Sequence, residues 1–71
     1  MSELTSQEKI LVEGAVSLLK DLGHSECNSD NLFTNTTYSS WFLERLEENI
    51  VRYSKDHPIQ EILQSLKDRI P

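Results

Sequence analysis

Residues 36–55 read TTYSSWFLERLEENIVRYSK and hold four of the five aromatic side chains of the chain. At about 100° per residue, one flank of a helix over this stretch is apolar. That flank consists of Phe42, Leu46, Ile50 and Tyr53, with Leu43 at its edge. A second flank consists of Trp41, Arg45, Glu48 and Arg52. The first flank predicts a helix that faces a core, and the second carries residue types that are enriched at protein contacts.

The ends of this helix are predicted from its flanking residues. Thr36 or Thr37 is the expected N-cap, because a hydroxyl oxygen can accept a hydrogen bond from the free amides of the first turn. Pro58 disfavours helical geometry in the residue before it and suits the first turn of a new helix. We therefore expect helices at about 38–55 and 58–69.

The helix expected at 58–69 has a narrow apolar stripe, whose members are Ile59, Ile62, Leu63, Leu66 and Ile70. Its other positions are polar or charged. Because the connection to the preceding helix is short, the two helices are expected to pack as an antiparallel hairpin.

A further helix is expected at about 6–22, before the other two. Thr5 and Glu8 form a capping box, in which each side chain accepts from the other residue's amide. Gly23 is expected to end the helix in the left-handed conformation. Gly14 lies inside it at a cost of about 1 kcal/mol relative to Ala, which indicates either close approach of another backbone or a tolerated cost.

The apolar arc of this first helix is wider than one helical neighbour needs. Its main line is Leu11, Ala15, Leu18 and Leu22, which we expect in the core. Val12, Val16 and Leu19 lie to one side of that line. If these three are exposed, they form a patch that joins two copies in a twofold homodimer. Alternatively, the connection that carries Leu32 and Phe33 folds back over them and leaves a monomer.

The predicted fold class is all-α: a small three-helix bundle that forms one domain over residues 1–71, with a long irregular loop at 23–36. Within that loop, residues 30–33 can make a single helical turn. No alternation of apolar and polar residues predicts a strand.

Composition excludes several functional classes. The chain has 71 residues and a formal charge of −5, so a basic surface for nucleic acid or an anionic membrane is not expected. No apolar run approaches the roughly 20 residues of a membrane span. The first residues lack the basic and apolar regions of a signal peptide, and the single cysteine cannot form an internal disulfide. We expect a cytoplasmic protein.

The side chains that could take part in catalysis or metal binding do not form a recognisable site. His24, Glu26, Cys27 and Asp30 lack the paired His or Cys spacing of a zinc site. The three glutamates at 44, 47 and 48 point outward on the helical wheel, away from any desolvated cleft. No metal, cofactor or catalytic residue is therefore predicted.

The candidate partner-binding residues are Tyr38, Trp41, Arg45 and Arg52. They favour a non-enzymatic, cytoplasmic protein–protein interaction module, a regulator or adaptor of the kind encoded by bacteria or their phages. The alternative is an acidic inhibitor that mimics nucleic acid, because residues 1–36 hold six acidic and only two basic side chains.

Residues 41–46, WFLERL, resemble the W-F-x-E-R-L stretch of the theta accessory subunits of bacterial replicative polymerases, which are also small three-helix proteins. The resemblance covers six of the 71 residues and does not extend into the flanking helices. No functional residue is carried over from it.

Overall fold

The computed structural model describes residues 4–70. Over this range it contains only helices and no strand: α1 (Ser6–Asp21), α2 (Asn31–Thr34), α3 (Thr36–Arg52) and α4 (Ile59–Asp68). The all-α prediction is confirmed, and the three expected helices correspond to α1, α3 and α4. The four-residue helix α2 lies inside the segment predicted as a long irregular loop at 23–36, one residue later than the single turn that the sequence allows at 30–33.

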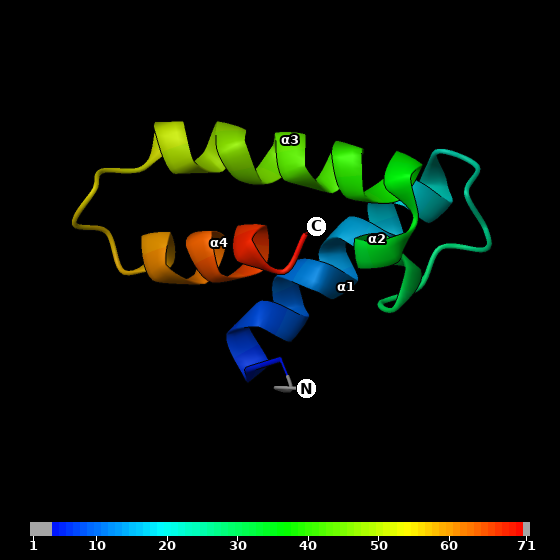
Figure 1. The fold of residues 1–71 in the computed structure, drawn as a ribbon, viewed down its shortest axis with the longest axis horizontal. Helices are drawn as coiled ribbons and strands as arrows, with labels where there is room; N and C mark the ends of the chain where they lie inside the picture. Colours follow the sequence, from blue (N-terminus) through cyan, green and yellow to red (C-terminus); the bar gives the residue numbers. More distant parts are fainter. Residues whose placement is uncertain (1–3, 71) are drawn as a thin grey trace.

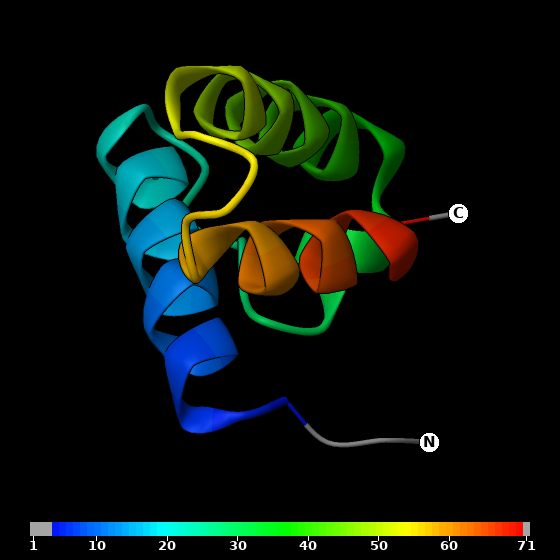
Figure 2. The same ribbon diagram turned by 90° about the vertical axis from the view of Figure 1, so that its left-hand side faces the viewer.

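The helices are arranged as a hairpin crossed by a third helix. Helices α3 and α4 lie side by side and antiparallel, joined by an extended connection (Figure 1). Helix α1 crosses this hairpin at a steep angle (Figures 1 and 2), and α2 packs against the start of α3. One side of α1 therefore packs into the core, while the side that carries Ile10 and Leu18 borders a groove toward α3.

Local signals determine both ends of α1. The predicted capping box is present: the Glu8 amide donates to Thr5 Oγ1 at 3.2 Å, and the Thr5 amide donates to Glu8 Oε1 at 2.9 Å. At the other end Gly23 has φ 105°, a left-handed conformation that only glycine adopts without strain. The chain therefore leaves α1 where the sequence predicted.

The start of α3 differs from the prediction. Asn35 is its N-cap, and not Thr36 or Thr37: Asn35 Oδ1 accepts from the amides of Thr37 and Tyr38 at 2.9 and 3.3 Å. The reason lies in α2, because the Asn35 amide also donates to the Asn31 carbonyl at 2.8 Å. Asn35 thus closes α2 and opens α3, which moves the helix start two residues earlier than expected.

The end of α3 comes three residues earlier than predicted, at Arg52. The side chain of Gln60 donates to the carbonyls of Ile50 and Tyr53 at 2.8 and 3.0 Å. These bonds replace the missing amide donors of a further helical turn. The connection to α4 begins there and gives the chain room to reverse.

The core is built from all four helices and one loop residue. Its fully buried apolar members are Val12, Ala15, Leu19, Cys27, Leu32, Tyr38, Phe42, Leu46, Leu63 and Leu66. The predicted stripes of α3 and α4 are confirmed at Phe42, Leu46, Leu63 and Leu66. The prediction for Tyr53 is wrong: α3 ends at Arg52, so Tyr53 does not continue the stripe and is exposed. For α1 the predicted main line is wrong, because the side chains of Leu18 and Leu22 are exposed and Leu11 is only half-buried.

The wrong side of α1 was predicted to be buried because residues 23–36, which were expected to form an irregular loop, contribute to the core. Leu32 in α2 is 0% exposed and Cys27 in the preceding loop is 1% exposed. Together they extend the core along the Val12 and Leu19 side of α1. The helix therefore turns that side inward and leaves Leu18 outside.

Candidate functional site

A groove of about 540 Å³ runs between α1 and α3 and reaches the start of α4. Its base is formed by buried apolar side chains of the core: Ala15, Phe42, Leu46 and Leu63. Because these side chains also hold the fold together, the groove is preformed and does not depend on a mobile segment. An apolar depression of this kind is the usual form of a binding site for an apolar group.

The α1 rim of the groove carries large apolar side chains that face solvent. Ile10 is 68% exposed and Leu18 is 54% exposed, and both line the groove. Gly14 lies midway between them, and a Cβ at this position would meet nothing within 4 Å. Of the two alternatives for Gly14, close approach of another backbone does not occur among residues 4–70.

The α3 rim carries an aromatic side chain with a cation above it. Trp41 is half-buried against the core, and the guanidinium carbon of Arg45 lies 5.7 Å from its ring centroid. Glu48 lies 3.3 Å from the same guanidinium, which holds Arg45 in place along the helix. Trp and Arg supported in this way are typical of the residues that contribute most to binding at protein interfaces.

The four predicted partner-binding residues are not all brought together. Trp41 and Arg45 line the groove, whereas Arg52 is exposed and lies outside the groove lining. Tyr38 is buried, with its ring 5.3 Å from that of His24 in an edge contact, so its prediction as a contact residue is wrong. Tyr38 is of a residue type enriched at interfaces, as is Trp41, but its position in the first turn of α3 places it in the core.

Three groove residues were missed as site residues: Ile10, Gly14 and Leu18. Their i, i+4 spacing places them on one side of a helix, and this signal is present in the sequence. The pattern is masked because Leu18 also continues the predicted core line of α1, whereas Ile10 lies on neither predicted line.

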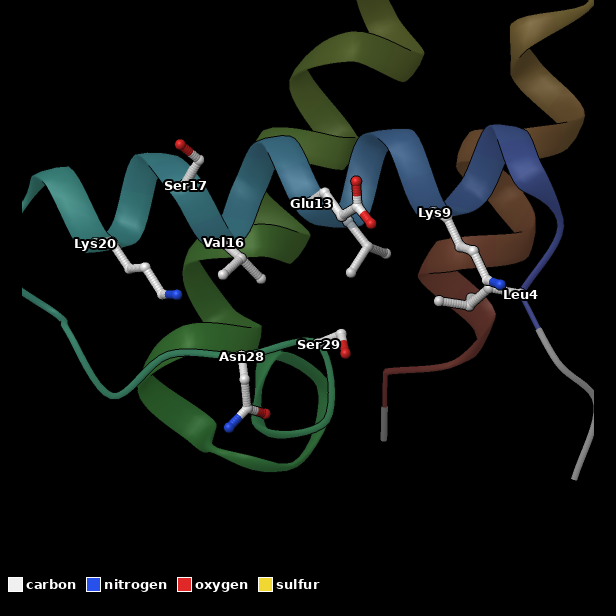
Figure 3. A pocket seen from close by; sticks show the side chains of 9 residues that line it. Leu4, Lys9, Glu13, Val16, Ser17, Lys20, Asn28 and Ser29 are labelled. Atoms are coloured by element: carbon white, nitrogen blue, oxygen red, sulfur yellow. The ribbon is translucent and has the colours of Figure 1, made fainter.

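The residues of the predicted self-association patch do not form an exposed surface, so this prediction is also wrong. Val12 and Leu19 are 1% and 2% exposed, and they belong to the core. Val16 is half-buried and faces the loop at Asn28 and Ser29 (Figure 3). The alternative expectation, that the loop folds back along this side of α1, is the one that the structure confirms.

A second groove remains between α1 and this loop, and Val12 and Val16 are among the residues that line it. Lys9 and Lys20 lie toward its two ends, and Glu13 lies between them on the same helix. These three charged side chains are exposed to solvent. The groove thus carries mixed charges without a buried polar group directed into it.

A polar cluster holds α1 against α4. Ser65 Oγ donates to Glu8 Oε2 at 2.8 Å, and Arg69 Nε lies 3.5 Å from the same oxygen. The pKa of the Glu8 carboxyl lies below its ordinary value of 4.5, chiefly because the Thr5 amide donates to it and then because the Ser65 hydroxyl does. The ionised carboxylate is therefore the form that fixes the orientation of α1, and with it the shape of the groove.

Two kinds of chemistry can be checked among the described residues: a reactive thiol and a metal site. Burial raises the pKa of the Cys27 thiol, which keeps it in the less nucleophilic protonated form. Across residues 4–70 no three His, Cys, Asp or Glu side chains converge as metal ligands. In the same range, no helix has the length and apolar character that crossing a bilayer requires.

Comparison with family models, with curated proteins and with solved structures finds no match for this chain. The proposed function therefore rests on the groove and its residues alone.

Proposed function

We infer that this protein is a small, non-catalytic interaction module of the cytoplasm, and that the groove between α1 and α3 receives an apolar helix from another protein chain. A helix in a groove is a common recognition mode, in which side chains at i, i+3 or i+4 and i+7 fill an apolar depression. Regulators and adaptors of this size act through such contacts.

The single observation that carries the proposal is that residues typical of binding sites lie on both rims of the groove, on α1 and on α3. Ile10 and Leu18 on α1 expose more than half of their surface to solvent, and they face a Trp41 that is supported by Arg45. Folding leaves these apolar side chains uncovered, although covering them with a partner is favourable at about 25 cal/mol per Å². Large side chains exposed together beside a preformed depression are typical of a binding site.

The acidic inhibitor that mimics nucleic acid has less support. On α3, Glu48 lies 3.3 Å from Arg45, and Glu47 lies 3.9 Å from Lys67 of α4. Basic side chains of the same chain therefore interrupt the acidic surface. A mimic needs a continuous anionic surface to occupy a basic groove.

Site-specific photo-crosslinking tests the proposed function. A benzophenone amino acid replaces Leu18 at the α1 rim, and in a control replaces Val51, which is 85% exposed and lies outside the groove lining. Both variants are expressed in the source cells and irradiated. We expect a discrete crosslinked protein at position 18 and none at position 51.

A second change shows that the crosslink depends on the groove. Trp41→Ala removes an aromatic side chain from the opposite rim, and we expect it to reduce the crosslink at position 18 about 30-fold, the effect of an interface hot spot. Equal crosslinking at positions 18 and 51, or none at either, would contradict the proposed function.

A further inference from the structure

The outer side of α1 has a palindromic arrangement about its glycine. Five exposed residues follow one another at spacings of three, four, four and three positions: Gln7, Ile10, Gly14, Leu18 and Asp21. Spacings of three and four keep these residues on one side of the helix. Read in either direction, the order is polar, apolar, glycine, apolar, polar.

We propose that the occupant of the α1/α3 groove is α1 of a second copy, in a twofold dimer whose two α1 helices cross antiparallel at Gly14. In this arrangement Ile10 of each copy contacts Leu18 of the other. The two glycines meet at the axis, where the absence of Cβ atoms allows the backbones to approach closely. This inference rests on the proposed function, because it names the partner of the same groove.

Charge favours the antiparallel order over the parallel one. Asp21 is the only charged residue among the five palindromic positions. An antiparallel crossing at Gly14 sets Asp21 opposite Gln7 of the other copy, whose amide can donate to the carboxylate. A parallel order sets Asp21 against Asp21, and like charges placed opposite each other are unfavourable.

The contact area is sufficient for a reversible dimer. With 16 residues, α1 is about 24 Å long. A strip of that length that includes both α1 and the α3 rim of the groove is about two helix diameters wide and covers about 500 Å². This is about a tenth of the 5087 Å² exposed by the chain, which is the share of a small protein's surface that a specific interface buries. The size lies at the lower end of specific interfaces, so we expect a Kd on the order of 1–100 μM.

Sedimentation equilibrium over a range from about 1 μM to 1 mM, which brackets that Kd, tests the dimer. The variants are Leu18→Glu, which places a charge in the contact, and Val51→Glu, which makes the same change at an exposed residue outside the groove. We expect the unaltered chain and Val51→Glu to dimerise equally. Leu18→Glu should raise the Kd at least 30-fold, since each dimer loses the contact twice. A monomeric parent at 1 mM, or an undiminished Leu18→Glu dimer, would overturn the proposal.

A second variant guards against a loss of folding in Leu18→Glu. Gly14→Gln adds a side chain where a Cβ meets no atom within 4 Å, so the monomer has space for it. It also improves helix propensity, and therefore the variant should fold and still lose dimerisation. A Gly14→Gln chain that dimerises like the parent would contradict the crossing at Gly14.

Disulfide trapping tests the orientation. Ile10→Cys and Leu18→Cys chains are mixed and oxidised, while the native Cys27 is buried and does not compete. We expect the mixed dimer to form faster than the dimer of either variant with itself, and equal rates would overturn the antiparallel arrangement. If the parent is monomeric but position 18 still crosslinks to another protein, the dimer fails and the proposed function stands.

Discussion

The two sides of α1 are similarly apolar in sequence, but only one of them is buried in the folded chain. One side contributes Val12 and Leu19 to the core, whereas Leu18 on the other side remains 54% exposed. The difference arises outside the helix, from what packs against each side. Leu32 and the Glu8 cluster with α4 fix the buried side, while the other side meets only an open groove. Apolar periodicity predicts that a helix is amphipathic, and tertiary contacts decide which part of a wide arc is buried.

The largest expected effect tests the role of the loop in this difference. Leu32→Ala should lower the free energy of unfolding by about 2–5 kcal/mol, because Leu32 is fully buried and its removal leaves a cavity beside α1. Urea denaturation followed by circular dichroism measures the change. The matched control is Leu22→Ala at an exposed leucine, which should cost less than about 1 kcal/mol. Equal effects would show that α2 does not determine the buried side of α1.

The next effect concerns the polar attachment of α1 to α4. Glu8→Gln should cost about 1–3 kcal/mol, because the amide group cannot accept at both of the oxygens that bind Thr5 and Ser65. The same urea titration measures it. Ser65→Ala removes one of these donors and should cost less than Glu8→Gln. A neutral Glu8→Gln would show that the cluster does not hold the helix.

The ionisation of Glu8 also predicts a pH dependence. Its pKa is lowered in the folded chain, so the ionised form stabilises the fold and the unfolded chain binds the proton more tightly. This contribution is fully present well above the ordinary value of 4.5 and is lost as the pH falls through the lower folded pKa. Thermal unfolding between pH 7 and pH 3 should show a steeper loss of stability for the unaltered chain than for Glu8→Gln. Parallel curves would contradict this assignment.

The smallest effect distinguishes folding from binding on the exposed side. Gly14→Ala should stabilise the monomer by about 0.5–1 kcal/mol, because alanine has the higher helix propensity and its Cβ meets no other atom. Thermal unfolding in dilute solution measures this gain. A loss of stability would show that the outer side of α1 is packed within the chain.

Local chemistry made much of this fold predictable. The capping box at Thr5, the left-handed Gly23 and the break at Pro58 predicted the boundaries of α1 and α4 to within one residue. The apolar stripes of α3 and α4 predicted most of their core residues because each stripe is narrow and has one possible orientation, but the α3 stripe wrongly included Tyr53 and omitted Tyr38. Asn35 as a cap was missed, since its role depends on the α2 turn that precedes it.

The candidate site was less predictable than the fold. Residue type singled out Trp41 and Arg45, which line the groove, but the side chains across the groove from them come from a helix nearly 30 residues earlier in the chain. Their proximity depends on how α1 crosses α3, and no local pattern encodes that rotation. The wide arc of α1 left two orientations open, and the choice between them moved Leu18 from the predicted core to the rim of the groove.

The most direct test of this account compares glutamate at two adjacent leucines. Leu18→Glu places a charge on the exposed side of α1, and Leu19→Glu places the same charge in the core, where an unpaired carboxylate is strongly unfavourable. Far-ultraviolet circular dichroism with thermal melting of both variants in dilute solution is the measurement. We predict that Leu18→Glu retains the helical spectrum and a cooperative transition, whereas Leu19→Glu is unfolded. An unfolded Leu18→Glu beside a folded Leu19→Glu would show that α1 presents the opposite side to the core.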